Sequence, residues 1–205
     1  MNSKNSKQHW NEIYTKNLPE EVSWFQKEPA VSLEIIQRVG NKESRIIDVG
    51  GGASTLASCL LKKGYSHVAV LDISDKAIEY AKKKLANQSD KVEWYVDDIT
   101  NFVSPHSYDI WHDRAVFHFL TDKESRALYV RTLKNTLNPG SFVIIASFAK
   151  DGPAKCSGLD IIQYDAASIQ HELGNEFLLL ENQLETHQTP KGNKQHFTYF
   201  LFQRR

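Results

Sequence analysis

The sequence lacks the features that mark a disulfide-bonded, membrane-spanning or secreted protein. Its 205 residues include only two cysteines, Cys59 and Cys156, so neither a disulfide framework nor a zinc signature is indicated. No apolar run is long enough to cross a bilayer. The opening residues, MNSKNSKQHWNE, contain no apolar stretch of the kind found in secretory signals. We therefore expect a cytoplasmic protein that does not associate with membranes.

The chain also carries no net charge at pH 7. The 25 basic and 25 acidic residues cancel, so the protein has no global field that would gather nucleic acid. We expect no nucleic-acid partner, and a monomer is the default oligomeric state. The length suits one domain with a sizeable core. Residues 1–205 are therefore expected to form a single domain, with 1–40 as an N-terminal helical cap and 41–205 as the core.

Short apolar runs typical of buried strands alternate with amphipathic patterns typical of helices. This alternation predicts an α/β fold with three layers, in which helices cover both faces of a mostly parallel sheet. The turn-forming residues 189–193 predict an antiparallel hairpin at the end. The predicted strands are 45–49, 67–71, 92–96, 108–112, 141–148, 177–187 and 195–203. The predicted core helices are 54–63, 75–86, 122–137 and 165–173.

The stretch from Arg45 to Thr55 organises this pattern, because a buried strand ends at Asp48 and three glycines follow. Gly50, Gly51 and Gly52 let a ligand approach the backbone, and the following helix offers unpaired N–H groups. This turn predicts a nucleoside cofactor. Asp72 ends the second predicted strand, where its carboxylate can accept hydrogen bonds from ribose hydroxyls. The alternative is that Asp72 only caps the next turn.

The turn favours S-adenosylmethionine (SAM) over NAD. Counted from Gly50, the last position of the dinucleotide fingerprint is Thr55, so that fingerprint fails. Asp48 would repel a pyrophosphate but could receive the ammonium group of SAM. It could also be a purely structural acid. An NAD(P)-dependent oxidoreductase and a non-catalytic nucleoside-binding module remain as distant alternatives.

The sequence resembles the class I, seven-β-strand SAM-dependent methyltransferases. The resemblance rests on Asp48-Val49-Gly50-Gly51-Gly52, Asp72, Asp98-Ile99, Asp109-Ile110-Trp111-His112-Asp113 and Leu137-Asn138-Pro139-Gly140-Ser141. The sequence departs from the family pattern at two positions. Ser54 replaces the third glycine of the glycine turn, and Ser141 replaces the second glycine of the turn that follows Pro139. The resemblance implies a Rossmann-like sheet with strand order 3-2-1-4-5-7-6, strand seven antiparallel. It also implies SAM as the cofactor and S-adenosylhomocysteine (SAH) as the product. The cofactor-binding residues it implies are Trp24, Asp48, Gly50, Gly51, Gly52, Asp72, Ile73, Asp98, Ile99 and Asp113.

Part of the sequence is similar to the branch that contains the elongation-factor and citrate-synthase lysine methyltransferases. The similar segments are His9 to Tyr14, Val22 to Phe25 and Asp113 to Phe117, with Arg114 in place of a lysine. A small-molecule acceptor is favoured by the neutral, compact chain with its aromatic N-terminus. A protein-lysine acceptor is the alternative.

The residues expected near the reacting atoms follow the fourth predicted strand. His112, Asp113 and Arg114 are the candidate catalytic residues. His112 or His118 could act as a base, and Asp113 could orient a donor amine. The alternative for each histidine is a packed residue with a satisfied ring.

Two further features could contribute to the site. The aromatic residues Trp10, Tyr14, Trp24 and Phe25 could form a lid over the cofactor or could simply anchor a packed helix. Cys156 lies in the predicted loop 149–164 and is expected to be inert. No metal site is expected, because His187 and His196 lack the spacing of metal ligands.

Overall fold

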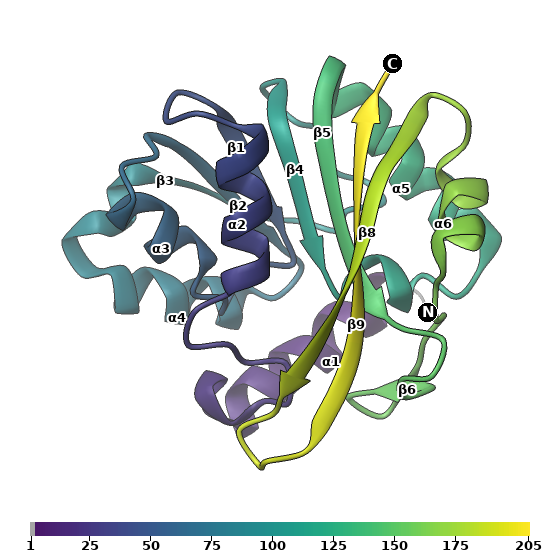
Figure 1. Cartoon of the computed structure of the whole chain (residues 1–205). Helices are drawn as coiled ribbons and strands as arrows, with labels where there is room; N and C mark the ends of the chain where they lie inside the picture. The colour runs from purple at the N-terminus through teal and green to yellow at the C-terminus, as the bar shows by residue number, and fades with distance from the viewer. Residues whose placement is uncertain (1–2) are drawn as a thin grey trace.

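The computed structural model describes residues 3–205, and a seven-stranded sheet lies at its centre (Figure 1). The strand order is β3-β2-β1-β4-β5-β9-β8. The first five of these strands pair in parallel, whereas β9 is antiparallel to both β5 and β8. The bounds are β1 Arg45–Val49, β2 His67–Asp72, β3 Val92–Val96, β4 Tyr108–Arg114, β5 Leu137–Phe148, β8 Phe177–Gln188 and β9 Lys194–Arg204.

The predicted strand order is confirmed. The sixth and seventh predicted strands are β8 and β9, because a short hairpin of β6 (Lys155–Cys156) and β7 (Leu159–Asp160) precedes them. This hairpin lies within the segment 149–164 that we predicted to be a loop. It pairs only with itself and forms a separate two-stranded sheet.

Helices cover both faces of the large sheet, as predicted (Figure 1). One face carries α2 (Ala30–Val39), α3 (Leu56–Lys62) and α4 (Asp75–Leu85), and the other carries α5 (Lys123–Thr136) and α6 (Ala166–Leu173). Neighbouring residues of a strand pack on opposite faces of the sheet. Ile46 packs on the face that carries α2, α3 and α4, Ile47 packs on the face that carries α5 and α6, and both are fully buried. Short 3₁₀ turns, η1 (Pro19–Glu21), η2 (Ala86–Lys91) and η3 (Phe117–Phe119), complete the connections.

The N-terminal helix α1 (Ser3–Lys16) lies across the carboxyl ends of the parallel strands (Figure 1). It is fastened to the start of α4, where Ser74 Oγ donates to Asn11 Oδ1 at 2.7 Å and Lys7 pairs with Asp75 at 3.3 Å. After α1, Glu20 accepts hydrogen bonds from the side chains of Tyr80 and Lys84. The N-terminal segment is therefore docked on the same edge of the sheet to which the predicted cofactor residues belong.

Several element ends differ from the predicted ranges, and two of the differences have a local cause. α5 begins at Lys123 and not at the predicted residue 122, because Asp122 is the N-cap: its carboxylate accepts from the backbone N–H of Ser125 at 2.8 Å. β5 begins at Leu137 and not at the predicted residue 141, and its pairing is irregular: Leu137 pairs with Tyr108, whereas Phe142 pairs with Ile110. The extra residues bulge out of the ladder because Gly140 adopts a positive φ of 91°.

Within residues 3–205, no helix combines the length and the apolar character needed to cross a membrane. The same part of the chain contains no group of three or more His, Cys, Asp or Glu side chains arranged to hold a metal ion.

Candidate functional site

The glycine turn after β1 is shaped by close contacts with its neighbours. Gly50 has a φ of +72°, which an L side chain rarely adopts, and a Cβ there would lie 2.0 Å from Val116 Cγ2. A Cβ on Gly51 would lie 2.2 Å from Asp48 Oδ2. The backbone N–H of Gly50 donates to the carbonyl of Leu71 at 2.7 Å and ties the turn to β2. The turn therefore lies directly against two strand ends, with no space for side chains between them.

Asp48 carries an unpartnered oxygen beneath this turn. Its Oδ1 lies 2.7 Å from Nδ1 of His112, and both side chains are only 3% exposed. Its Oδ2 is buried and has no hydrogen-bond partner among the described residues. A buried carboxylate oxygen without a donor raises the free energy of the folded state. Asp48 lines a small cavity together with Gly51, Ser54 and Thr55, so a ligand's ammonium group in that cavity would supply the missing donor.

Asp72 faces a second, larger cavity. Its carboxylate accepts hydrogen bonds from the backbone N–H groups of Gly52 at 3.0 Å and Ser74 at 2.8 Å. Burial raises the pKa of Asp72 to about 6, and these two backbone donors offset part of that effect. A carboxylate has about four acceptor positions. Asp72 therefore keeps the capacity to accept from both hydroxyls of a ribose.

The larger cavity has a volume of about 510 Å³, within the range of small-molecule sites. Ile73, Asp98 and Ile99 line it from the ends of β2 and β3. Asp98 is held in place because its Oδ1 accepts from the backbone and the hydroxyl of Thr100 at 2.9 and 2.7 Å. Of the residues predicted to bind the cofactor, only Gly52 and Asp113 line neither cavity. The backbone N–H of Gly52 instead holds the carboxylate of Asp72 in place.

The two cavities share a border. Five residues line both of them, namely Tyr14, Trp24, Val49, Gly50 and Arg114. A ligand with its ammonium group at Asp48 and its ribose at Asp72 would pass between the cavities at this border. In SAM the sulfonium connects those two parts of the molecule, so the residues of both cavities fit the predicted cofactor.

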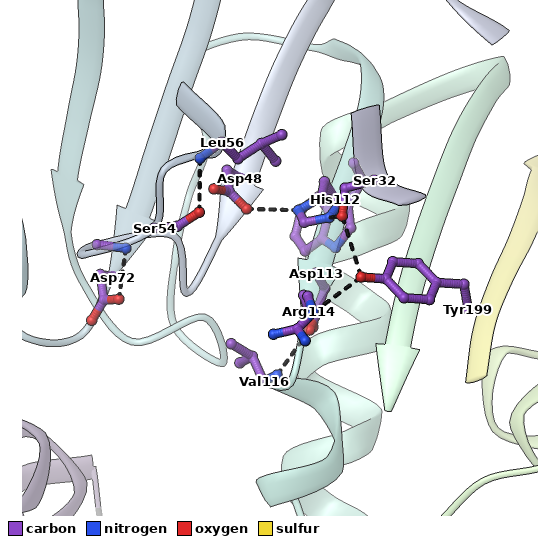
Figure 2. Close-up of polar contacts among 12 residues, drawn as sticks. Ser32, Asp48, Ser54, Leu56, Asp72, His112, Asp113, Arg114, Val116 and Tyr199 are labelled. Carbon is purple, nitrogen blue, oxygen red and sulfur yellow. Dashed lines mark hydrogen bonds and ion pairs between the residues drawn. The ribbon is translucent and has the colours of Figure 1, made fainter. Parts of the chain in front are cut away.

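Asp113 lies elsewhere, which corrects the prediction that it binds the cofactor or orients a donor amine. Successive residues of a strand point to opposite faces, so Asp113 faces α5 while His112 faces α2. Its Oδ1 accepts from the backbone N–H of Val116 at 2.9 Å (Figure 2). Its Oδ2 accepts from the Tyr129 hydroxyl at 2.7 Å. Asp113 is fully buried and lines neither cavity. It fixes the turn that leads into η3.

Neither histidine is arranged as a free base. Both ring nitrogens of His112 are engaged, one with Asp48 and the other with Ser32 Oγ at 2.9 Å. His118 is buried next to Phe119 and Phe148, lines neither cavity, and has no partner for either nitrogen among the described residues. Burial lowers the pKa of His118 to about 3, so its ring stays neutral.

Arg114 connects the sheet to the N-terminal segment. Its guanidinium donates to the backbone carbonyl of Trp24 at 3.0 Å and to the hydroxyl of Tyr199 at 3.0 Å. Glu185 of β8 lies 3.5 Å from it and provides the counter-charge. The predicted catalytic residue therefore lines the border between the cavities and also holds Trp24 in place.

The aromatic N-terminal residues form one contiguous cover. Trp10 meets Trp24 edge-on with ring centroids 5.8 Å apart and meets Phe119 at 5.0 Å, and Tyr14 lies 6.4 Å from Trp24. Trp10, Tyr14 and Trp24 all line the larger cavity. Phe25 lies in the wall of the smaller cavity. Trp10, Tyr14 and Trp24 therefore pack against one another and also line the larger cavity, which is compatible with either alternative from the sequence.

Cys156 lies in the wall of the larger cavity, at the hairpin β6–β7. It is 6% exposed, and burial raises the pKa of its thiol to about 12. The thiol is therefore protonated at neutral pH and contributes an apolar surface.

Sequence reasoning missed Ser32 and Tyr199. Ser32 is fully buried on the apolar face of α2, and Tyr199 is 1% exposed within the aromatic run of β9. The only local signal is a hydroxyl group placed at a core position. Both contact His112 or Arg114 across the fold, and no sequence spacing relates them.

Comparisons with known proteins support a family assignment. A family model described as a methyltransferase domain matches residues 40–201. Malonyl-[acyl-carrier protein] O-methyltransferase 1 of Ilyobacter polytropus is 32% identical over 99 residues, which cover 48% of this chain and 37% of that protein. The similarity therefore spans little more than a third of this relative.

Solved structures share the fold. Magnesium protoporphyrin IX methyltransferase from Synechocystis PCC 6803, with bound SAH, superposes with a TM-score of 0.75 at 16% identity and covers 99% of each chain. The 1,6-didemethyltoxoflavin-N1-methyltransferase of Burkholderia thailandensis, with bound 1,6-didemethyltoxoflavin and SAH, gives a TM-score of 0.72 at 14% identity. That match covers 98% of this chain and 84% of the other. At these identities the two structures show a common fold.

The raised pKa of Asp72 predicts that cofactor affinity depends on pH. Because the folded-state pKa lies above the ordinary value of 3.8, the carboxyl stabilises the apo fold below about pH 3.8 and loses that contribution as the pH rises through about 6. Ribose hydroxyls favour the ionised form, so protonation competes with binding. The dissociation constant of SAH, measured by calorimetry, should rise as pH falls from 7 to 5, by up to about tenfold per unit below the pKa.

The matched variant for this experiment is Asp72→Asn. It should bind SAH more weakly at pH 7 and show no comparable pH slope between 7 and 5. A wild-type dissociation constant that stays flat over this range would show that Asp72 does not contact the ligand.

The close contacts of Gly50 predict that an added methyl group lowers the stability of the fold more at this position than at a glycine with open space around it. Gly50→Ala should be more destabilising than Gly64→Ala, because both glycines have positive φ but a Cβ on Gly64 would meet no atom within 4 Å. The backbone strain alone costs about 1–2 kcal/mol. Chemical denaturation should therefore give a larger loss for Gly50→Ala, and SAH binding should fall only in that variant. Equal losses in both variants would contradict the close contact with Val116.

Proposed function

This chain belongs to the class I SAM-dependent methyltransferases, and we propose that it transfers the methyl group of SAM to a small-molecule acceptor and releases SAH. The observation that carries the proposal is Asp48, whose buried Oδ2 has no partner among the described residues and which lines a cavity that adjoins the cavity of Asp72. An ammonium group for Asp48 and a ribose for Asp72 are both features of SAM. NAD instead carries a pyrophosphate, which the Asp48 carboxylate would repel.

The residues that would hold the cofactor divide between the two cavities. Asp48 would receive the ammonium group and Asp72 the ribose hydroxyls, while Ile73, Asp98 and Ile99 would border the adenine. When bound, SAM supplies an activated methyl group, so the protein's own contribution is to bind and orient the acceptor.

The wall of the larger cavity favours an apolar acceptor without a negative charge. Trp10, Phe119, Cys156 and Leu159 give it an apolar, partly aromatic surface. The same cavity is lined by the carboxyl side chains of Asp72, Asp97, Asp98, Asp122 and Glu124. Among the described residues that line it, Arg114 is the only cation, and Glu185 already pairs with it. A phosphate or carboxylate group on the acceptor would therefore be repelled.

The proposed chemistry is positioning and not proton abstraction by a histidine. His112 has both nitrogens engaged, His118 lies outside the cavities, and the Cys156 thiol is protonated. An acceptor atom that is already nucleophilic, such as an uncharged nitrogen, suits this environment.

We also propose that residues 1–40 act as a cap on the core 41–205, although residues 1–2 lie outside the described part. Besides the contacts of α1 and Glu20 with α4, two contacts hold the proposed cap near the cavities: Thr55 Oγ1 donates to the carbonyl of Gln26 at 3.0 Å, and Arg114 donates to the carbonyl of Trp24. Aromatic faces at the border of the cavities would attract the sulfonium, and a closed cap would exclude water.

A protein-lysine acceptor is the alternative, and it rests on the partial similarity of the N-terminal segments to lysine methyltransferases. The comparisons favour the first proposal, because the two solved structures are named for methylation of magnesium protoporphyrin IX and 1,6-didemethyltoxoflavin. An oxidoreductase or a non-catalytic nucleoside-binding module would need a different ligand in the same cavities.

Ligand binding tests the cofactor proposal. In a thermal-shift comparison, SAM and SAH should stabilise the protein, whereas NAD and NADP should not. Asp48→Asn should lose most of the shift, because its amide is a weaker partner for an ammonium group. Asp160→Asn, which changes an exposed acid on the β6–β7 hairpin, should keep the shift. Stabilisation by NAD alone would overturn the proposal.

The acceptor class is tested by following a radiolabelled methyl group from SAM into a cell extract. The label should enter the small-molecule fraction, and the labelled product should be neutral or cationic. Label in protein, on lysine, would support the alternative acceptor. A labelled product that carries a phosphate or carboxylate would contradict the charge argument for the larger cavity.

A further inference from the structure

A continuous network of buried side chains runs from the glycine turn to the C-terminal hairpin (Figure 2). Asp48 Oδ1 lies 2.7 Å from His112 Nδ1, and His112 Nε2 lies 2.9 Å from Ser32 Oγ. Ser32 Oγ is 3.5 Å from the hydroxyl of Tyr199, which accepts a hydrogen bond from Arg114 Nε at 3.0 Å. We call these five residues the buried polar network. They come from β1, α2, β4 and β9.

The two ends of the buried polar network limit the direction of its hydrogen bonds. Arg114 can only donate, so the Tyr199 oxygen accepts from Arg114, and the Ser32 hydroxyl donates to the same oxygen. At the other end an ionised carboxylate can only accept, so the contact at 2.7 Å is a hydrogen bond from Nδ1–H of His112 to Oδ1 of Asp48.

We propose that His112 is a positioning residue for the amino-acid end of the cofactor. By donating to Oδ1, it holds the Asp48 carboxylate at the smaller cavity and leaves Oδ2 without a partner among the described residues. The proposal rests on the proposed function, in which Asp48 receives the cofactor's ammonium group.

The consequence is selective for one part of the ligand. SAH and 5′-methylthioadenosine share the adenosine and the thioether sulfur, but only SAH carries the amino-acid group. A defect in the buried polar network should therefore weaken SAH and leave 5′-methylthioadenosine unaffected. A general loss of structure would weaken both ligands.

Calorimetric titration of both ligands tests this prediction. His112→Phe keeps a ring of similar size but removes both hydrogen bonds, and it should weaken SAH by about tenfold or more, as expected for a buried acceptor that loses its donor. Its affinity for 5′-methylthioadenosine should stay within about twofold. His112→Asn is the matched variant, because its amide N–H can replace Nδ1–H beside Asp48, and it should retain most of the SAH affinity.

The outcomes separate this inference from the proposed function. If the wild-type protein does not prefer SAH to 5′-methylthioadenosine, the contact between Asp48 and the ammonium group fails. If the wild type does prefer SAH and His112→Phe keeps that preference, the positioning role of His112 is wrong. Equal weakening of both ligands in His112→Phe, with the same result for His112→Asn, would also overturn it and assign His112 to the core.

A measurement on the unmodified side chain guards against a misfolded variant. Nitrogen-15 NMR of the wild-type imidazole at neutral pH should show a protonated Nδ1. Tyr199→Phe should change the Nε2 signal, because the Ser32 hydroxyl beside Nε2 loses its hydrogen-bond acceptor. A wild-type ring without hydrogen on Nδ1 would overturn the inference.

Discussion

The buried contact between Asp48 and His112 is the constraint on which the site depends. Two polar groups from adjacent parallel strands face each other at 2.7 Å in an apolar setting, and each needs the other to remain there. The contact leaves one carboxylate oxygen without a partner beneath a turn that lies too close to the strand end for any residue with a Cβ. The ligand-binding capacity of the site follows from that unpaired oxygen.

The sequence was informative wherever function is encoded locally. The strands and helices, the glycine turn and Asp72 follow from short patterns, because a strand, a turn and a helix start are determined by neighbouring residues. The strand order was predicted from the family resemblance. Asp113 was placed at the cofactor, although the alternation of side chains along a strand indicates otherwise. It lies between His112 and Arg114 and therefore faces the opposite layer. Ser32 and Tyr199 could not be found this way, because their roles arise only when α2 and β9 meet β4.

Arg114 joins two functions that the sequence suggested separately. It lines the border between the cavities and it donates to the carbonyl of Trp24, so the proposed cap and the proposed reaction centre share one side chain. Its charge is balanced by Glu185, from the same hairpin that supplies Tyr199. The C-terminal hairpin, at the edge of the sheet, thus supports the position of the N-terminal segment.

The carboxylates that line the larger cavity also bear on turnover. SAM enters with a positive sulfur, and SAH leaves without it, so methyl transfer removes one positive charge from the cofactor, and that charge passes to the methylated acceptor or leaves as a proton. The cofactor lies against a cavity lined by acidic side chains. The spent cofactor is therefore attracted less strongly than the fresh one. The acidic side chains that repel anionic acceptors therefore also favour the replacement of bound SAH by SAM.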